Sequence, residues 1–187
     1  IEGIRPFIND PATLETLNKS LFDEVNEKYA AGSISKWEMD SIGFYYHDHE
    51  LNQANTRWMD VVDFGKLGEE PSVERTFTTK NGQEIFIYEL SRVMGTVIGK
   101  DKLKNIVTLL TPTGVVKVKV YRSQFAKYDR QIADKDEETG KKTVREKSWF
   151  TRGNKMIVTG IRRGDFFVPK AYKNTPYAPF ELITNIN

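Results

Sequence analysis

The chain has 187 residues and a mass of 21.5 kDa, and its 28 Lys and Arg against 26 Asp and Glu give a formal net charge of +2. Hydrophobic residues make up 39% of it, enough for a buried core, so a wholly disordered chain is excluded. With no cysteine and no apolar run near the roughly 18 residues that span a bilayer, disulfides, thiolate metal sites and a membrane helix are excluded, and we expect a cytoplasmic protein.

The N-terminal part of the sequence predicts two helices. Asp10 is a helix-capping residue, and apolar residues recur every three or four positions between residues 11 and 29. Ser35 and Glu38 form a capping-box pattern for a second, shorter helix. We expect residues 1–51 to form a helical hairpin whose apolar faces pack together.

Residues 52–90 predict a linker and a β-hairpin. The apolar pattern is weak up to residue 70, which is typical of a connecting segment. Two β-prone runs, 73–79 and 84–90, then flank Asn81-Gly82. This pair accepts positive φ at both positions, so we expect a tight two-residue turn.

Residues 91–175 predict a small β-barrel. The expected strands are 92–98, 106–111, 115–121, 155–161 and 166–172. A helical piece at 123–131 and a charged, flexible loop at 134–147 separate the third strand from the fourth. Five strands with a helix in this place are typical of the oligonucleotide/oligosaccharide-binding barrel, the OB-fold. We therefore expect an α+β protein with an OB-fold domain, followed by a C-terminal tail at 176–187.

The small net charge hides an uneven distribution. Residues 1–91 carry 8 basic and 17 acidic side chains, a net charge of −9, whereas residues 92–173 carry 20 basic and 8 acidic side chains, a net charge of +12. This asymmetry favours a polyanionic partner for the barrel.

The third barrel strand carries the clearest functional pattern. Valines alternate there with Lys117, Lys119 and Tyr121, so the valines point into the barrel and the two cations and the ring point outward. In an OB-fold, this outer face and the neighbouring loops hold a single nucleic-acid strand by phosphate neutralisation and base stacking. The candidate nucleic-acid-binding residues are Lys100, Lys102, Lys104, Lys117, Lys119, Tyr121, Arg162, Arg163 and Phe166. Further candidate stacking rings are Phe125, Trp149, Phe167 and Tyr172, although an aromatic residue in a small barrel more often belongs to the core.

Residues 47–50, His-Asp-His-Glu, contain side chains that metal ions favour. Consecutive residues of a loop point in different directions, and the helical spacing His-x-x-x-His is missing, so we expect a polar turn in which His49 bonds to the backbone. The sequence also lacks a phosphate-binding glycine loop and a Gly-x-Ser-x-Gly elbow. We expect no catalytic residue, no metal, no cofactor and no small-molecule substrate within this chain.

Residues 36–51 (KWEMDSIGFYYHDHEL) resemble a segment of the bacterial replicative DNA polymerase III alpha subunit that lies shortly before the OB-fold of that subunit. The matching positions are Ile42, Gly43, Phe44, Tyr45, His49 and Leu51, and the departures are Tyr46, His47, Asp48 and Glu50. The barrel is similar to that OB-fold as well, over residues 93–97, 107–109, 114–118 and 153–160 and at Phe125 and Tyr128.

The resemblance implies a C-terminal segment of a bacterial or phage DNA-directed DNA polymerase whose catalytic carboxylates lie upstream of this chain. The first residue, Ile1, is not Met, which agrees with an excised segment. The family's OB-fold is associated with the single-stranded template, so we expect single-stranded DNA as the partner, with other replisome proteins possible in addition. Two alternatives stay open: a protein-interaction module whose acidic helices dock a replisome partner, and an RNA-binding OB-fold.

Overall fold

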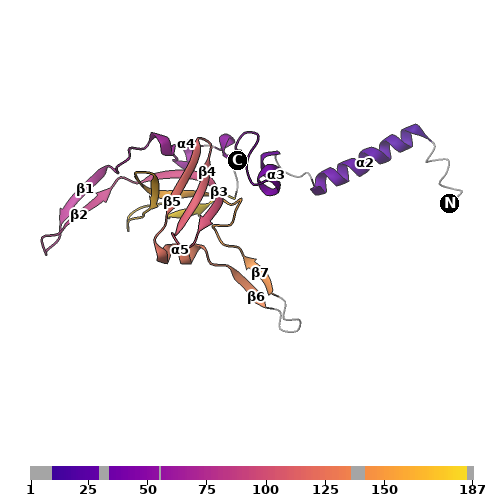
Figure 1. Cartoon of the computed structure of the whole chain (residues 1–187). Coiled ribbons are helices and arrows are strands. Elements are labelled where there is room, and N and C mark those ends of the chain that lie inside the picture. Colours follow the sequence, from indigo (N-terminus) through magenta and orange to yellow (C-terminus); the bar gives the residue numbers. More distant parts are fainter. Residues whose placement is uncertain (1–9, 30–33, 55, 136–141, 185–187) are drawn as a thin grey trace.

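The computed structural model describes residues 10–29, 34–54, 56–135 and 142–184 (Figure 1). The helices are α2 (Pro11–Tyr29), α3 (Ile34–Ser41), α4 (Thr56–Met59) and α5 (Arg122–Tyr128), with short 3-10 helices η1 (Glu50–Gln53) and η2 (Phe64–Lys66). The strands are β1 (Val73–Thr78), β2 (Glu84–Tyr88), β3 (Ser91–Asp101), β4 (Ile106–Thr111), β5 (Gly114–Lys119), β6 (Ile132–Lys135), β7 (Lys142–Glu146), β8 (Lys155–Arg163), β9 (Phe166–Pro169) and β10 (Phe180–Leu182).

Strands β3, β4, β5, β9 and β8 form a closed barrel. Strand β8 pairs with β3 through its first half and with β9 through its second half, which closes the sheet on itself. The pairs are antiparallel except β5–β9, which runs parallel with Lys117 opposite Phe166. Helix α5 lies between β5 and β8 in the chain. The predicted α+β class and the OB-type barrel are therefore confirmed.

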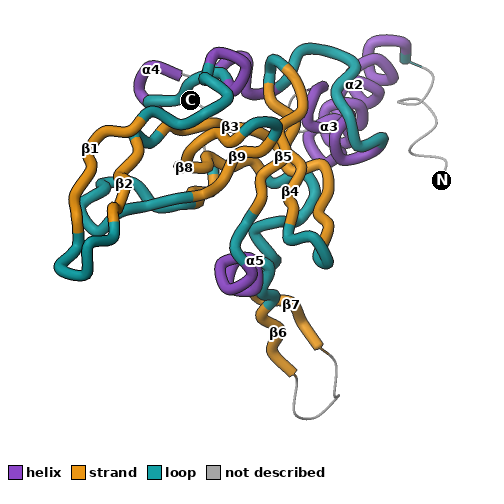
Figure 2. Tube along the Cα trace, turned by 60° about the vertical axis from the view of Figure 1, so that its left-hand side comes forward, coloured by secondary structure: helices purple, strands orange, loops and turns teal. Residues whose placement is uncertain are grey.

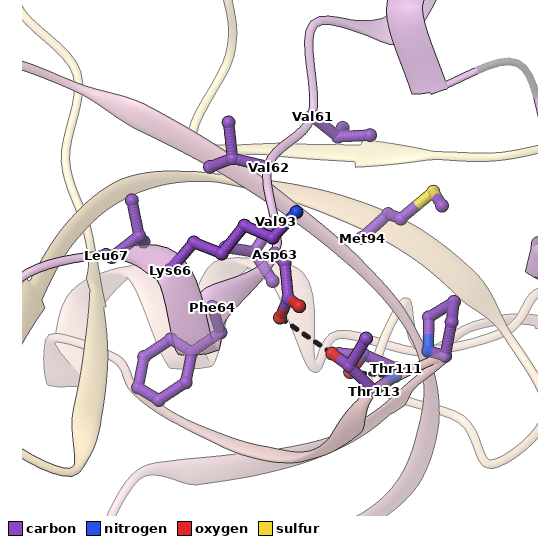
Figure 3. Close-up of a pocket in the computed structure, with 11 residues that line it drawn as sticks. Val61, Val62, Asp63, Phe64, Lys66, Leu67, Val93, Met94, Thr111 and Thr113 are labelled. Carbon is purple, nitrogen blue, oxygen red and sulfur yellow. Dashed lines mark hydrogen bonds between the residues drawn. The ribbon is translucent and has the colours of Figure 1, made fainter.

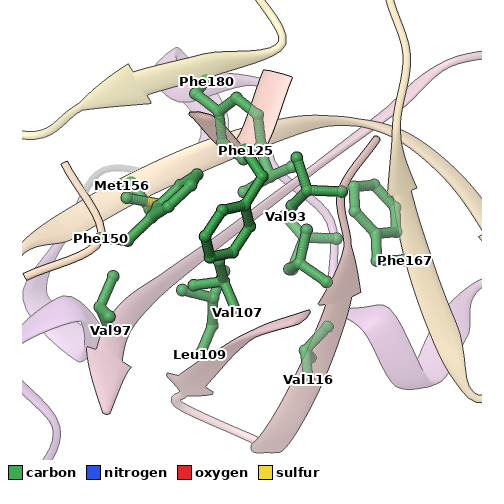
Figure 4. Close-up of a cluster of buried hydrophobic side chains, with 13 residues drawn as sticks. Val93, Val97, Val107, Leu109, Val116, Phe125, Phe150, Met156, Phe167 and Phe180 are labelled. Carbon is green, nitrogen blue, oxygen red and sulfur yellow. The ribbon is translucent and has the colours of Figure 1, made fainter. Parts of the chain in front are cut away.

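The barrel interior is filled by side chains from every barrel strand and from α5 (Figure 4). The buried cluster consists of Val93, Val97, Val107, Leu109, Val116, Val118, Val120, Phe125, Phe150, Met156, Val158, Phe167 and Phe180. Burying one such side chain contributes about 1.5 to 3 kcal/mol, so the cluster supplies the main force that closes the barrel.

The segments on either side of the barrel pack against it. The ring of Phe64 in η2 lies edge-on to Phe167, with centroids 6.3 Å apart. The buried guanidinium of Arg92 donates to the Met59 carbonyl and to Glu181, the latter at 2.9 Å. The linker of residues 52–70 is thus part of the barrel's outer layer, and the predicted tail includes β10, which pairs with β8 as a sixth strand.

The two N-terminal helices form, but the predicted packing of one on the other is wrong. The apolar stripe of α2 is exposed, with Leu17, Leu21 and Val25 at 48%, 55% and 54%. Figure 1 shows α2 pointing away from the rest of the molecule, whereas α3 lies against the barrel. Met39 of α3 is buried and lies near Gly153, just before β8, whereas the described residues provide no packing partner for the apolar stripe of α2. Among the described helices, none combines the length and the apolar composition of a membrane span.

Two β-hairpins project from the barrel. The β1–β2 hairpin is confirmed, but its turn is longer than predicted: the last strand pair is Thr78 with Glu84, and Gly82 has positive φ while Asn81 does not. A hydrogen bond from the Thr79 N–H to the Gln83 carbonyl, 2.8 Å, closes this wider turn. The prediction of a flexible loop at 134–147 is wrong at the two ends that the structure describes, because these ends pair as strands β6 and β7.

Candidate nucleic-acid interface

Strand β5 presents the cations and rings outward as its alternation predicts. Val116, Val118 and Val120 are 2%, 0% and 3% exposed, so they belong to the core. Lys117 and Lys119 point the other way and are exposed. Thr108 and Ile106 of β4 lie opposite these two lysines, so the exposed face continues onto the neighbouring strand.

The end of β5 forms one side of a surface hollow of about 310 Å³. Lys119, Tyr121, Arg163 and Phe166 line it together with Val120 and Val168. Tyr121 is 60% exposed, and the Lys119 ammonium lies 5.6 Å from the centre of the half-buried Phe166 ring. The structure therefore brings together four of the nine residues that the sequence singled out, from three different strands and the start of α5.

The β3–β4 turn contributes fewer free cations than expected. Lys100 and Lys102 both pair with Asp129, the latter at 3.2 Å, and the Ser148 hydroxyl donates to the same carboxylate at 2.7 Å. Burial raises the pKa of Asp129, but the hydrogen bonds from Lys100, Ser148 and Lys102 outweigh it, so the pKa is lowered and the carboxylate stays charged. Lys100 thus ties the turn to the end of α5.

Lys104 and the side chain of Lys102 remain open to solvent in this turn. The Asp101 carboxylate accepts the backbone N–H groups of Leu103 and Lys104, both at 3.0 Å, and so fixes the turn's shape. Because Ile106 pairs with Lys119, the turn lies at the Lys119 end of the exposed face.

The two neighbouring arginines of the β8–β9 turn have different surroundings. Arg162 is half-buried and donates to the carbonyls of Gly164, Phe64 and Leu67 at 2.9, 3.3 and 2.7 Å. It holds η2 against the barrel and is not available to a strand. Arg163 is exposed, and its guanidinium lies 5.6 Å from the ring of Tyr88 at the end of β2.

The other candidate stacking rings lie partly in the core and partly in contacts with other side chains or the backbone. Phe125 and Phe167 are 5% and 0% exposed and belong to the core, as the general preference for buried aromatics predicts. Trp149 packs on Tyr128, with centroids 5.0 Å apart. Tyr172 is half-buried, and its hydroxyl accepts the backbone N–H of Tyr88 at 2.8 Å. No local pattern singles out Tyr88, because its place beside the barrel depends on a contact with Tyr172, 84 residues away in the chain.

His49 hydrogen-bonds to the backbone in a structural position, as expected from the sequence. The backbone N–H of Leu51 donates to its Nδ1 at 3.0 Å, so Nε2 carries the hydrogen and donates to the Leu110 carbonyl at 2.9 Å. Burial lowers the pKa of His49, which keeps the ring neutral. Among the described residues, no group of three or more His, Asp or Glu is placed to hold a metal ion.

This histidine and its neighbours cover the β3–β4 part of the barrel surface. The hydroxyls of Tyr45 and Thr96 form a hydrogen bond of 3.1 Å, and Leu51 is fully buried against Met94 and Ile157. The β5–β9 part carries no such cover within the described residues, so it is the open part of the barrel surface.

A second hollow, of about 460 Å³, lies between η2 and the barrel (Figure 3). Its walls are mainly apolar side chains such as Val93, Met94 and Leu67. The Thr113 hydroxyl donates to Asp63 at 2.7 Å across its rim, and this bond is the largest cause of the lowered pKa of Asp63. Lys66 also lines the hollow, but the Asp63 carboxylate and the mainly apolar walls do not suit phosphate, so we do not include this hollow in the candidate interface.

The closed five-stranded barrel, with one open face of cations and rings, defines an OB-fold-like domain with a candidate nucleic-acid interface. Over 177 residues, 95% of its length, the chain is 45% identical to a probable DNA polymerase, YorL, of Bacillus subtilis (strain 168), and equally to a DNA-directed DNA polymerase of Bacillus phage SPbeta. The chain spans 13% of the length of each relative. No family model matches the chain, and no solved structure matches it.

Proposed function

We propose that this chain is the single-stranded-DNA-binding module of a bacterial or phage replicative DNA polymerase of the DNA polymerase III alpha type, and that it is not itself catalytic. The similarity to two proteins named as DNA polymerases supports the polymerase assignment. The resemblance of residues 36–51 to a polymerase III alpha segment supports the subtype. In this proposal the module holds the template strand while catalysis takes place elsewhere in the longer protein.

The observation that carries the proposal is the open face formed by Lys117, Lys119, Tyr121, Arg163 and Phe166. Cations here neutralise phosphates, and the exposed ring of Tyr121 offers a flat surface to a base. Neither process reads base identity, because every nucleotide has a phosphate and a π-face. The binding we propose is therefore independent of sequence.

The charge state of this face favours a polyanion. Within the part of the chain that the structure describes, Lys117 and Lys119 form no ion pair with a carboxylate. Lys100, by contrast, is already neutralised by Asp129. Phosphates would therefore meet free ammonium groups on β5 and would not have to displace an internal partner.

The test is binding of a fluorescent oligo-dT to the 187-residue chain, followed by anisotropy. We expect Lys117→Gln with Lys119→Gln to weaken binding about 5- to 30-fold, from about 0.5 to 1 kcal/mol per exposed cation. The matched control is Lys19→Gln with Lys80→Gln, which removes the same charge from exposed positions on α2 and in the β1–β2 turn, outside the face. Equal losses in both variants would show a general charge effect and contradict the proposed site.

Two outcomes would favour the other classes of function. Tighter binding of a matched oligo-U than of oligo-dT, with the 2′-hydroxyl as the cause, would favour an RNA-binding barrel. No retardation of either strand at low salt would favour a protein-interaction module.

A further inference from the structure

Cations and aromatic rings alternate beyond the open face of β5, toward the β1–β2 hairpin. Lys119 lies 5.6 Å from the Phe166 ring, and Arg163, which pairs with Phe166 across the β8–β9 turn, lies 5.6 Å from the Tyr88 ring. Lys170 then lies 4.8 Å from Tyr88. The same Lys170 ammonium is 5.5 Å from the ring of Tyr172. These contacts between cations and rings therefore form a continuous series from the hollow at β5 to the base of the β1–β2 hairpin.

The fold holds the far end of this series firmly. The N–H of Tyr88 donates to the Tyr172 hydroxyl at 2.8 Å, and the N–H of Lys170 donates to the Thr159 carbonyl at 3.0 Å. Along β9, Phe166 and Val168 are half-buried while Phe167 and Pro169 are buried, so continuing the alternation places Lys170 on the outer side. Figure 2 shows the β1–β2 hairpin beside β8 and β9, on the side away from β4.

We propose that Tyr88, Lys170 and Tyr172 form a second nucleotide-binding segment for the same strand, an inference that rests on the proposed function. The strand would lie across Lys119 and Phe166, pass Arg163, and place one or two further nucleotides at the base of the hairpin. There Lys170 neutralises a phosphate and the half-buried tyrosine rings offer an edge or face to a base. The hairpin would then extend the site size beyond that of the barrel alone.

A purely structural role makes a different prediction. If the contacts of Lys170 and Tyr88 only fix the hairpin to the barrel, their removal changes stability and leaves DNA affinity unchanged at every length. A binding role makes the affinity loss depend on the length of the strand. Length dependence is therefore the readout that separates the two roles.

The experiment measures the affinity of the chain for oligo-dT from about 4 to about 16 nucleotides, the range of site sizes of OB-folds. In the unchanged protein we expect affinity to rise with length until both segments are filled. Tyr88→Leu and Lys170→Gln should each end this rise at a shorter length and weaken binding of the longest oligomers. We expect a loss of about 5- to 150-fold for the stacked base in Tyr88→Leu. For the cation removed in Lys170→Gln we expect a loss of about 2- to 5-fold. Both should leave the shortest oligomers unaffected. Phe86→Leu, which removes an exposed ring from the same hairpin, is the matched control.

A second measurement gives a positive signal that does not depend on variants. Oligo-dT carrying one 5-iodo-deoxyuridine is photo-crosslinked at each position in turn, and the modified residue is identified by mass spectrometry. We expect Tyr121 from one end of the oligomer and Tyr88 or Tyr172 from the other. If oligo-dT binds and depends on Lys117 and Lys119, but no crosslink or length effect involves Tyr88, the second segment is refuted and the proposed function stands. If oligo-dT does not bind at all, both are refuted.

Discussion

Gly160 lies where the barrel closes, and replacing it with alanine should open the β8–β9 seam. A Cβ atom at this position would lie 2.1 Å from the Val168 carbonyl oxygen and 2.9 Å from the Pro169 Cα. Both are backbone atoms of the partner strand, and Gly160 pairs directly with Pro169. The clash therefore cannot be relieved by rotating a side chain.

The loss of stability expected for Gly160→Ala follows from the backbone shift that the added Cβ atom requires. Overpacking that shifts backbone typically costs about 1 to 3 kcal/mol, and here the shift needed is larger than one ångström and breaks ladder hydrogen bonds, so we expect about 3 kcal/mol or more. Gly99 provides the matched control, because a Cβ there meets nothing within 4 Å and its φ is not in the left-handed region. Gly99→Ala should be neutral or stabilise by up to about 1 kcal/mol.

Urea unfolding of the two variants and the unchanged chain measures this difference, with the fluorescence of Trp149, packed on Tyr128, as one reporter. At a slope of about 1 to 3 kcal/mol per molar urea, the midpoint for Gly160→Ala should fall by about 1 to 3 M. A midpoint unchanged from that of the parent chain, or an equal fall for Gly99→Ala, would refute a barrel closed at this seam.

Three further predictions concern single side chains. Burial lowers the pKa of His49, so the unfolded chain binds a proton more readily than the folded chain. The free energy of unfolding should therefore be highest above about pH 6.5 and fall as the pH drops below that value. In His49→Gln this part of the pH dependence should be lost. Asp129→Asn should lower the free energy of unfolding at neutral pH by about 1 to 3 kcal/mol, a difference that fades as acid protonates the parent carboxylate through its lowered pKa. Arg162→Gln should reduce stability but not oligo-dT affinity, and Arg163→Gln should do the opposite; equal effects on both would contradict their assigned roles.

Local pattern was sufficient to predict the barrel. The alternation in β5 depends only on the two-residue period of a strand, so the inward valines and outward Lys117 and Lys119 were predicted correctly. The backbone role of His49 was also predicted, because consecutive loop residues cannot share one ligand. These features need no knowledge of distant contacts.

The roles of individual site residues depended on tertiary contacts that no local pattern contains. Arg162 and Arg163 are adjacent and chemically equal in sequence, and they differ because the carbonyls of Phe64 and Leu67, nearly one hundred residues upstream, accept from Arg162 alone. Lys100 is neutralised by Asp129 across the barrel end. The apolar stripe of residues 11–29 predicted the helix α2 correctly but its burial wrongly, because periodicity does not identify the packing partner, and the described residues provide none.

The central claim is that phosphates of a single strand are held on the open face of β5. The direct measurement is the slope of log K against log salt for oligo-dT, which for single strands falls by about 0.7 per phosphate neutralised. We predict a steep negative slope for the parent chain and a slope shallower by about 1.4 for the Lys117→Gln, Lys119→Gln variant. A flat slope for the parent chain, or an unchanged slope in the variant, would contradict the account.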